Sequence, residues 1–193
     1  TVDTSLPAAP AITAMTTDTG VLGDLITGDN TLLFSGTSEA DATIELFVGS
    51  TSVGTTTANG SGVWTFDYSG TTLSDDAYSI TATAQDASGN TSVASTSFNL
   101  TIDVVAPAAP SVDSITVDSG ILGDLITSDN TLLISGTAEA NSTVELMVGG
   151  ISVGTVAANG SGAWSFDYTG TVLSDGSYLF SATATDAAAN TSV

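Results

Sequence analysis

The sequence consists of two similar repeats with a period of 100 residues. Residue n aligns with residue n+100 without a gap, and runs such as "LGDLIT", "ANGSG" and "FDY" recur in register. Solenoid repeats are roughly 20 to 50 residues long, whereas about 100 residues is a common size for a whole domain. The sequence therefore predicts two tandem domains, residues 1–103 and 104–193, joined inside "LTIDVVAPAAP", where Pro107 and Pro110 stiffen the entrance to the second repeat.

Within each repeat, apolar and polar residues alternate with the period of a β-strand. In "TIELFVGS" the side chains of Ile44 and Leu46 point to one face and that of Glu45 points to the other. Runs such as "ANGSG" and "SGN" provide turns, because glycine and asparagine tolerate positive φ. About seven short strands with regular turns are typical of an immunoglobulin-like β-sandwich. We expect an all-β protein of two tandem immunoglobulin-like β-sandwich domains without the cysteine pair, in which Tyr78 and Tyr178 form tyrosine corners.

The charge of the chain is one-sided. It has 21 acidic side chains, no lysine, arginine or histidine, and a formal net charge of -21, yet 41% of its residues are hydrophobic. Salt bridges between side chains are therefore impossible, and self-repulsion opposes a compact state. Nucleic acid and acidic membrane surfaces are disfavoured as partners, because phosphate binding rests on lysine and arginine. We expect a hard cation from outside the chain to neutralise the carboxylates.

Other residue classes narrow the possibilities further. Without cysteine, the chain forms no disulfides, zinc–thiolate sites or thiol nucleophiles. No apolar run approaches the roughly 20 residues of a membrane helix, so we expect no membrane insertion. No basic and apolar leader precedes Thr1, and "ASTSFNL" at 94–100 has no counterpart after Val193. We expect an internal fragment of something longer, in which the last strand of the second repeat is absent.

The runs "SGTAEANSTVEL", "ANGSGAWSFDYTG" and "DAAAN" of the second repeat, with the matching runs of the first, resemble the bacterial Ig-like repeats of giant secreted adhesins, which are type I secreted, RTX-type and biofilm-associated surface proteins. The resemblance covers both repeats almost end to end. The first repeat departs from the pattern with "DDA" at 75–77 and the second with "DAAAN" at 186–190. Neither departure changes the expected fold.

The resemblance implies a function. Such domains are extender modules with Ca²⁺ at their junctions, so the chain is expected to be a calcium-stiffened spacer on an extracellular bacterial cell surface, acting in adhesion or biofilm formation. Its partners are then the neighbouring repeats of the same chain, while a glycan or surface ligand is bound by other domains of the parent protein.

Tracing the strands alternately up and down places the acidic loops at the ends of each domain. The loop "DTGVLGDLITGDN" follows the first strand and lies at the bottom, whereas "SEADA" and "DASGN" return to the top. Ca²⁺ takes roughly six to eight oxygen ligands, and carboxylates gathered without a cation repel one another. The predicted metal ligands are Asp18, Asp24, Asp103, Glu139 and Asp186 at the junction, Asp3, Glu39 and Asp86 at the free N-terminal end, and Asp118 and Asp124 in the second copy of the loop.

Several of these residues have plainer interpretations. Asp18, Asp24 and Asp29 are also the kind of turn residue that caps its own backbone. Trp64 and Trp164 alternate with core residues, which favours a place in the core over a sugar-stacking platform.

Other function classes remain as alternatives. A glycosidase would use paired carboxylates such as Glu39 and Asp86; with no basic, histidine or cysteine side chain to assist, a metal cage describes them better, and we predict no enzymatic activity. A module that binds glycan, ice or another surface is the alternative function. The threonines of "TSVGTTTA" suggest it, but "ISVGTVAA" in the second repeat does not keep them.

Overall fold

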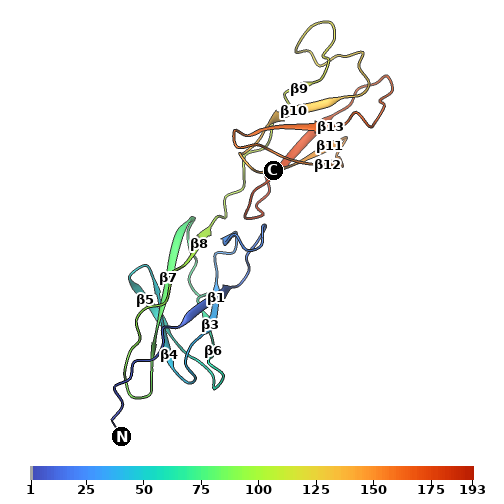
Figure 1. Ribbon diagram of the computed structural model, residues 1–193. Helices are drawn as coiled ribbons and strands as arrows, with labels where there is room; N and C mark the ends of the chain where they lie inside the picture. The colour runs from blue at the N-terminus through green and yellow to red at the C-terminus, as the bar shows by residue number, and fades with distance from the viewer. Residues whose placement is uncertain (1) are drawn as a thin grey trace. The chain divides into compact units, whose positions relative to one another are not determined.

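The computed structural model describes residues 2–193 and divides into two compact units, unit 1 (Thr1–Val104) and unit 2 (Val105–Val193) (Figure 1). Within 2–193 the regular elements are all β-strands. No helix in this described range is long and apolar enough to cross a membrane. The all-β fold of two tandem immunoglobulin-like sandwiches is thereby confirmed.

Unit 1 is built from two β-sheets, in which most neighbouring strands are antiparallel. One sheet has the order β1-β3-β6 and the other the order β2-β8-β7-β4-β5, in which only β2 and β8 run parallel. The strands are β1 (Ala11–Met15), β2 (Ile26–Thr27), β3 (Leu33–Thr37), β4 (Thr43–Val48), β5 (Thr51–Thr57), β6 (Val63–Asp67), β7 (Asp76–Gln85) and β8 (Phe98–Ile102).

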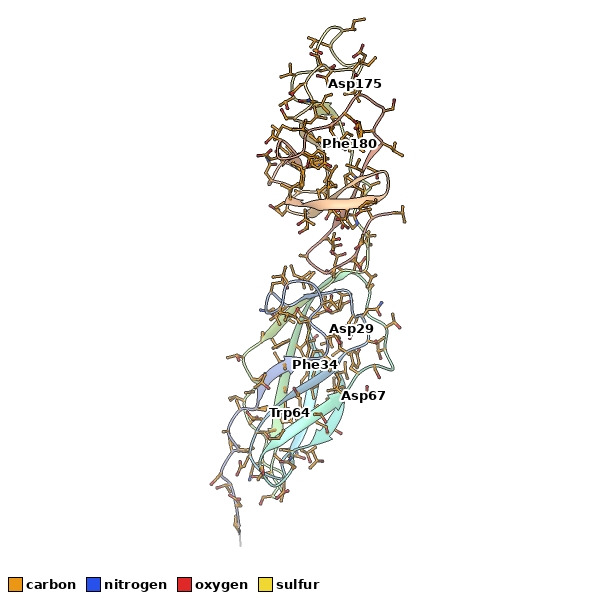
Figure 2. All side chains as sticks on the ribbon, turned by 90° about the vertical axis from the view of Figure 1, so that its right-hand side faces the viewer. Asp29, Phe34, Trp64, Asp67, Asp175 and Phe180 are labelled. Carbon is orange, nitrogen blue, oxygen red and sulfur yellow. The ribbon has the colours of Figure 1, made fainter. Side chains whose placement is uncertain are left out.

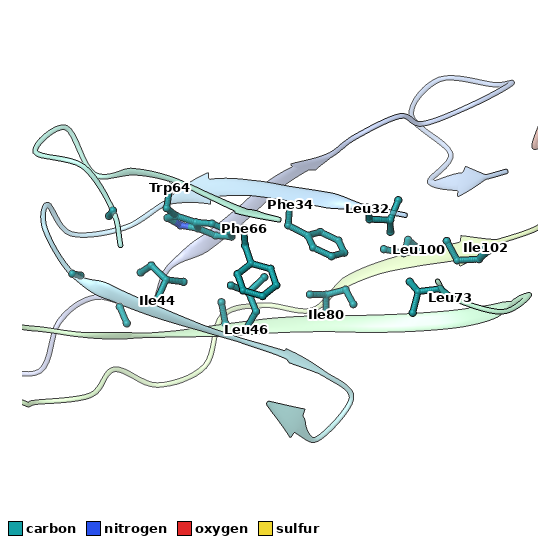
Figure 3. Packing of buried hydrophobic residues seen from close by; sticks show 14 residues of the cluster. Leu32, Phe34, Ile44, Leu46, Trp64, Phe66, Leu73, Ile80, Leu100 and Ile102 are labelled. Atoms are coloured by element: carbon teal, nitrogen blue, oxygen red, sulfur yellow. The ribbon is translucent and has the colours of Figure 1, made fainter. Parts of the chain in front are cut away.

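The core of unit 1 lies between its two sheets (Figure 3). Ile44 and Leu46 of β4 are fully buried while Glu45 between them is not, which is the alternation expected of a strand with one face on the core. From the other sheet, Phe34 and Trp64 reach into the same cluster. The predicted inward face of the strands is therefore confirmed.

Unit 2 repeats this plan with fewer strands. Its sheets have the orders β13-β10-β9 and β12-β11-β14. The strands are β9 (Ser114–Ile115), β10 (Leu133–Thr137), β11 (Thr143–Val148), β12 (Ile151–Ala157), β13 (Ala163–Asp167) and β14 (Phe180–Thr185). Within the described residues, unit 2 has no counterpart of β8, and β14 begins later than the corresponding β7.

Each unit carries a bulge on the outermost strand of one of its sheets, β5 in unit 1 and β12 in unit 2. The register between β4 and β5 slips between Leu46 and Phe47, and the register between β11 and β12 slips at the same place. Gly54 adopts φ 140° there, and a Cβ on it would lie 3.1 Å from the ring of Phe66. Gly154 adopts φ 144°. A glycine is required for the close approach and the backbone conformation alike.

The tyrosine corners are confirmed. The hydroxyl of Tyr78 donates a hydrogen bond to the carbonyl of Ser74 at 3.0 Å, and Tyr178 makes the same bond to Ser174 at 3.0 Å. Each bond fastens the start of β7, or the segment before β14, to the loop that precedes it.

The turn at 186–190 holds one strained residue. Ala189 adopts φ 70°, whereas the first repeat has Gly89 with φ 88° at this position. A residue with a Cβ in the left-handed region costs roughly 1–2 kcal/mol, part of which is offset because alanine restricts the unfolded chain more than glycine does. We expect Ala189→Gly to stabilise unit 2 by about 0.5–1 kcal/mol, seen as a Tm higher by a few degrees.

The reverse change in unit 1 is the matched control. A Cβ on Gly89 would meet no atom within 4 Å, so Gly89→Ala introduces only backbone strain and should lower the Tm of unit 1. If both substitutions shift stability in the same direction, the left-handed backbone is not the cause.

Candidate functional site

The repeated aspartate loop, residues 18–30 in unit 1, lies at the end of the sandwich where β8 leaves it. The amide of Thr101 donates to the carbonyl of Leu25 at 2.8 Å, and the amide of Asp103 donates to the carbonyl of Thr27 at 2.9 Å. These bonds extend the short parallel pairing of β2 with β8. The structure thus brings Asp103 beside the loop that carries Asp18, as the strand tracing predicted.

A buried threonine organises the loop. Thr27 is fully buried, and its hydroxyl donates to the carbonyl of Thr17 at 2.6 Å while accepting from the amide of Asp29 at 3.0 Å. The hydroxyl of Thr19 accepts from the amide of Gly28 at 2.7 Å. Hydroxyl groups therefore hold the loop closed from inside, a role that its sequence did not reveal because threonine is common throughout the chain.

Asp18 uses its two carboxylate oxygens differently. Oδ2 accepts a hydrogen bond from the amide of Gly23 at 2.5 Å, while Oδ1 is buried and has no hydrogen-bond partner. Asp118 repeats the pattern, since Oδ2 accepts from the amide of Gly123 at 2.6 Å and Oδ1 is again buried without a partner. A buried acceptor without a donor is costly, and more so when it carries charge.

The other aspartates of the loop form turns. Asp24 Oδ1 accepts from the amide of Ile26 at 2.9 Å, and Asp29 Oδ1 accepts from the amide and the hydroxyl of Thr31, both at 3.0 Å. The turn-forming interpretation is therefore confirmed for Asp29 and describes one oxygen each of Asp18 and Asp24. Asp29 is labelled in Figure 2.

Leucine occupies a left-handed position within the loop of both repeats. Leu25 has φ 60° and Leu125 has φ 58°. Non-glycine residues in this region carry strain and are over-represented at functional sites. The backbone at this position is therefore held by the rest of the loop rather than by the preference of the residue itself.

Asp86 lies at the opposite end of unit 1. Its Oδ1 accepts from the amides of Ser88 and Asn90, at 2.8 and 2.9 Å, and its Oδ2 accepts from the side-chain amide of Asn90 at 2.8 Å. The side-chain bond from Asn90, with further help from backbone amides, lowers the pKa of Asp86 below its ordinary value, against the opposing effect of desolvation. This carboxylate is therefore held in its charged form.

Asp3 and Glu39 are placed at this same end. The side-chain amide of Asn90 donates to the backbone carbonyl of Asp3 at 3.2 Å. The loop with Glu39 precedes β4, whose first residue Thr43 pairs with Gln85 just before Asp86. The structure thus brings the three residues to one end, as expected, and the backbone oxygen of Asp3 is the atom that faces Asn90.

Unit 2 arranges Glu139 and Asp186 in the same way. Thr143 pairs with Thr185, which sets the loop of Glu139 beside the turn that begins at Asp186. Asp186 Oδ1 and Oδ2 accept from the backbone and side-chain amides of Asn190, both at 2.9 Å. Asp124 Oδ1 accepts from Ile126 at 3.0 Å, as Asp24 does in unit 1.

Carboxylates do not crowd together at either end. Among residues 2–193, no three acidic side chains lie close enough to hold a metal ion between them. A cation bound at these ends would need backbone carbonyls and water as well as carboxylates. The predicted ligand set stays a prediction.

Sequence reasoning missed one contact near the exit of β8. Asp75 Oδ1 accepts a hydrogen bond from the amide of Val104 at 2.8 Å, a bond across 29 residues. The sequence indicates only a turn former at Asp75, because an aspartate side chain commonly bonds to backbone amides in its own turn. Asp75 instead fastens the last residue of unit 1.

The two tryptophans lie in the core. Trp64 is 1% exposed and Trp164 is 3% exposed, and Figure 2 labels Trp64 on its strand. Neither indole face is available to stack on a sugar. The core interpretation is confirmed, and the tryptophan platform that a glycan-binding module would use is ruled out.

Comparison with known proteins places both halves of the chain in one family. The profile described as the bacterial Ig-like domain matches residues 5–104 and 106–193. No curated protein matches the chain.

Several solved structures are similar to the chain. A Ca²⁺-stabilised adhesin that helps an Antarctic bacterium to bind ice is 29% identical with a TM-score of 0.47, covering 98% of this chain and 48% of that one. A 1.5-MDa bacterial ice-binding adhesin is 25% identical with a TM-score of 0.45, covering 97% and 62%. A tetra-tandem repeat from the extending region of a large adhesion protein is 27% identical with a TM-score of 0.37, covering 95% and 47%. The chain thus spans less than two thirds of each solved chain.

Proposed function

The chain belongs to the bacterial Ig-like domain family, and we propose on that basis that it is an extender module of a large bacterial cell-surface adhesin. In this role the two sandwiches space an adhesive region from the cell surface in adhesion or biofilm formation, and Ca²⁺ stiffens them. The module acts outside the cell, contacts neighbouring repeats of its own chain and catalyses no reaction. Glycans or other surface ligands are bound by other domains of the parent protein.

The observation that carries the calcium part of this proposal is the buried, unpartnered Oδ1 atom of Asp18 and of Asp118. Oδ1 has no hydrogen-bond donor in either repeat, although Oδ2 of the same carboxylate accepts a hydrogen bond from a loop amide in each. The chain has no lysine, arginine or histidine to neutralise it. A cation from solution would relieve the cost of burying this charge.

Ca²⁺ fits the chemistry of these donors. It prefers carboxylates, backbone carbonyls and water, and it tolerates irregular geometry. Asp18 and Asp24 with Asp103 would hold it in unit 1, and Asp118 and Asp124 in unit 2. When bound, Ca²⁺ supplies two positive charges that join loop segments which otherwise repel one another.

We further propose that Asp103, Glu139 and Asp186 bind Ca²⁺ at the junction of the two domains, and that Asp3, Glu39 and Asp86 are the matching group for a preceding repeat. Interfaces between domains of one chain are usually small and permit relative motion. The stiffness of a row of tandem domains would therefore depend more on Ca²⁺ coordination at the junctions than on packing between the domains.

Small-angle X-ray scattering tests the stiffening. In Ca²⁺ the chain should give a narrow distribution of maximum dimensions, and in EDTA a broader one, at matched ionic strength. Asp103→Ala should give the broad distribution even in Ca²⁺, because it removes one carboxylate from the proposed junction site.

Asp76→Gly is the matched control. It removes the same charge from the same unit and installs the residue that the second repeat has at position 176, so its profile should still narrow in Ca²⁺. Profiles that superimpose with and without Ca²⁺, or an Asp103→Ala variant as stiff as the parent chain, would contradict the proposal.

A further inference from the structure

The turn that joins β5 to β6 is built around an asparagine–glycine pair, and unit 2 repeats this pair between β12 and β13. Asn59–Gly60 and Asn159–Gly160 stand at matching positions, and all four residues are exposed. The other six asparagines of the chain precede threonine, serine or leucine. In these two turns, therefore, the backbone amide that follows the asparagine carries no side chain to shield it.

Backbone amides hold the side-chain carbonyl of Asn59 in place. Its Oδ1 atom accepts hydrogen bonds from the amide of Ser61 at 2.9 Å and from the amide of Val63 at 3.0 Å. Donors at about 2.7–3.1 Å from a carbonyl oxygen stabilise the negative charge that develops on it when a nucleophile attacks the carbonyl carbon. The arrangement at Asn59 therefore has the geometry of an oxyanion hole.

The amide of Gly60 is the nearest nucleophile in the chain. Within residues 2–193 this amide donates no hydrogen bond, and a Cβ on Gly60 would meet no atom within 4 Å. The bond from Ser61 to Asn59 Oδ1 closes an Asx turn, a ring that contains both Asn59 Cγ and the nitrogen of Gly60. The turn therefore holds an open amide beside a carbonyl group whose oxygen is already bonded to two donors.

Unit 2 has the same arrangement with one donor more. Asn159 Oδ1 accepts from the amides of Ser161 and Ala163, at 2.9 and 3.1 Å. The hydroxyl of Ser161 also donates to this oxygen, at 2.7 Å. The two units therefore differ in a side-chain donor while they share the backbone donors.

We propose that Asn59 and Asn159 are sites of spontaneous deamidation, a modification for which water is the only co-reactant. The nitrogen of the following glycine forms a bond to Cγ of the asparagine, and the bond from Cγ to Nδ2 breaks. The proton of the glycine amide leaves with the departing group as ammonia. The resulting cyclic imide is opened by water to aspartate or isoaspartate, and no atom is oxidised or reduced.

The reaction adds a carboxylate to the acidic end of each unit. The amide of Asp41 donates to the backbone carbonyl of Asn59 at 3.4 Å, and the amide of Asn141 donates to that of Asn159 at 3.3 Å. Each event makes the net charge of -21 more negative by one. Repulsion among the carboxylates at this end therefore increases as the protein ages. The proposal does not depend on calcium binding.

Mass spectrometry of chymotryptic fragments follows the reaction in the full 193-residue chain, incubated in mildly alkaline buffer. Each event raises the mass of a fragment by about 1 Da. The reaction should appear at Asn59 and Asn159 and should be about tenfold faster than in synthetic peptides of residues 55–65 and 155–165, because the folded turns fix the donors at Oδ1. Rates no higher than those of the peptides, or equal modification of all eight asparagines, would overturn the proposal.

Gly60→Ala tests the nucleophile. The backbone of Gly60 lies outside the left-handed region and the space for a Cβ is open, so the variant should melt as the parent chain does. The added methyl group hinders attack by the amide nitrogen, so Asn59 should stay unmodified over the time in which Asn159 reacts. Equal reaction at both sites in this variant would overturn the proposal.

Ser161→Ala tests the donors. It removes the hydroxyl from Asn159 Oδ1 and should slow the reaction there severalfold, without an effect at Asn59. Ser61→Ala is the matched control, because the two donors at Asn59 Oδ1 are backbone amides, and it should change neither rate. An unchanged rate at Asn159 in Ser161→Ala would show that donors at Oδ1 do not promote the reaction, and would overturn the proposal.

Discussion

Trp64→Ala is expected to unfold unit 1, and Trp164→Ala to unfold unit 2. Trp64 is 1% exposed and lies against Gly36, where an added Cβ would be only 2.3 Å from the indole Cζ2 atom. Truncating a buried tryptophan costs about 3–5 kcal/mol, which is a large part of the roughly 5–15 kcal/mol by which a domain is stable. Circular dichroism melts should show the affected transition lowered by about 15 to 30 °C or lost.

Trp64→Phe is the matched control. The Nε1 atom of Trp64 is buried without a hydrogen-bond partner, as is that of Trp164. Phenylalanine removes this unsatisfied group while it keeps an aromatic ring in the core, so part of the lost packing is offset. We expect less than half of the effect of alanine. A Trp64→Ala variant that keeps its melting transition but loses carbohydrate binding would contradict the core role and favour a binding module.

Calcium is expected to raise the thermal stability of both units far more than sodium does at equal ionic strength. Extracellular calcium modules have dissociation constants of about 10⁻⁴ to 10⁻³ M. A ligand at ten to a hundred times its dissociation constant adds about 1.4 to 2.7 kcal/mol for each site. The loop of each unit would then add about half of the free energy that the loss of its core tryptophan costs. Calorimetric melts in Ca²⁺, in EDTA and in EDTA with sodium chloride measure the difference.

Asp18→Asn, combined with Asp118→Asn, separates specific binding from screening of the net charge. The asparagine can still accept the hydrogen bond from Gly23 or Gly123, so stability in EDTA should be little changed, while most of the calcium shift should be lost. Asp67→Asn is the control, since the carboxylate of Asp67 accepts its hydrogen bonds from the amide and hydroxyl of Ser69 in its own turn. It should keep the calcium shift. Identical melting curves in Ca²⁺ and EDTA for the parent chain would end the calcium hypothesis.

Much of the fold could be predicted because its signals are local and repeated. Alternation fixed the inward faces of β4 and β6, and the same pattern in the second repeat gave β11 and β13. Tracing strands up and down was enough to place Asp103 beside the loop of Asp18, because the last strand must leave at the end opposite to the N-terminus. The tyrosine corner could be predicted because Tyr78 directly follows the polar loop "LSDDA" at 73–77.

The site could be predicted only in part, because its details depend on backbone conformation. A carboxylate in a loop can cap an amide or bind a cation, and Asp18 divides these roles between two atoms. That division depends on a loop closed by Thr27 and on the left-handed backbone of Leu25, neither of which has a sequence signature. β2 is two residues long, too short for alternation to be seen. Likewise, the departure at Ala189 was visible in the sequence, but its strain depends on the measured φ.

The glycine bulges on β5 and β12 bear on how a string of similar domains reaches its folded state. Neighbouring domains with nearly the same sequence can exchange strands during synthesis, since each offers the other an edge of matching pattern. β5 and β12 are the outermost strands of their sheets, and a bulge interrupts the regular row of backbone donors and acceptors that a foreign strand would need. Gly54 and Gly154 therefore favour pairing of strands within each domain, so that tandem copies can be added to a chain without exchanging strands with one another.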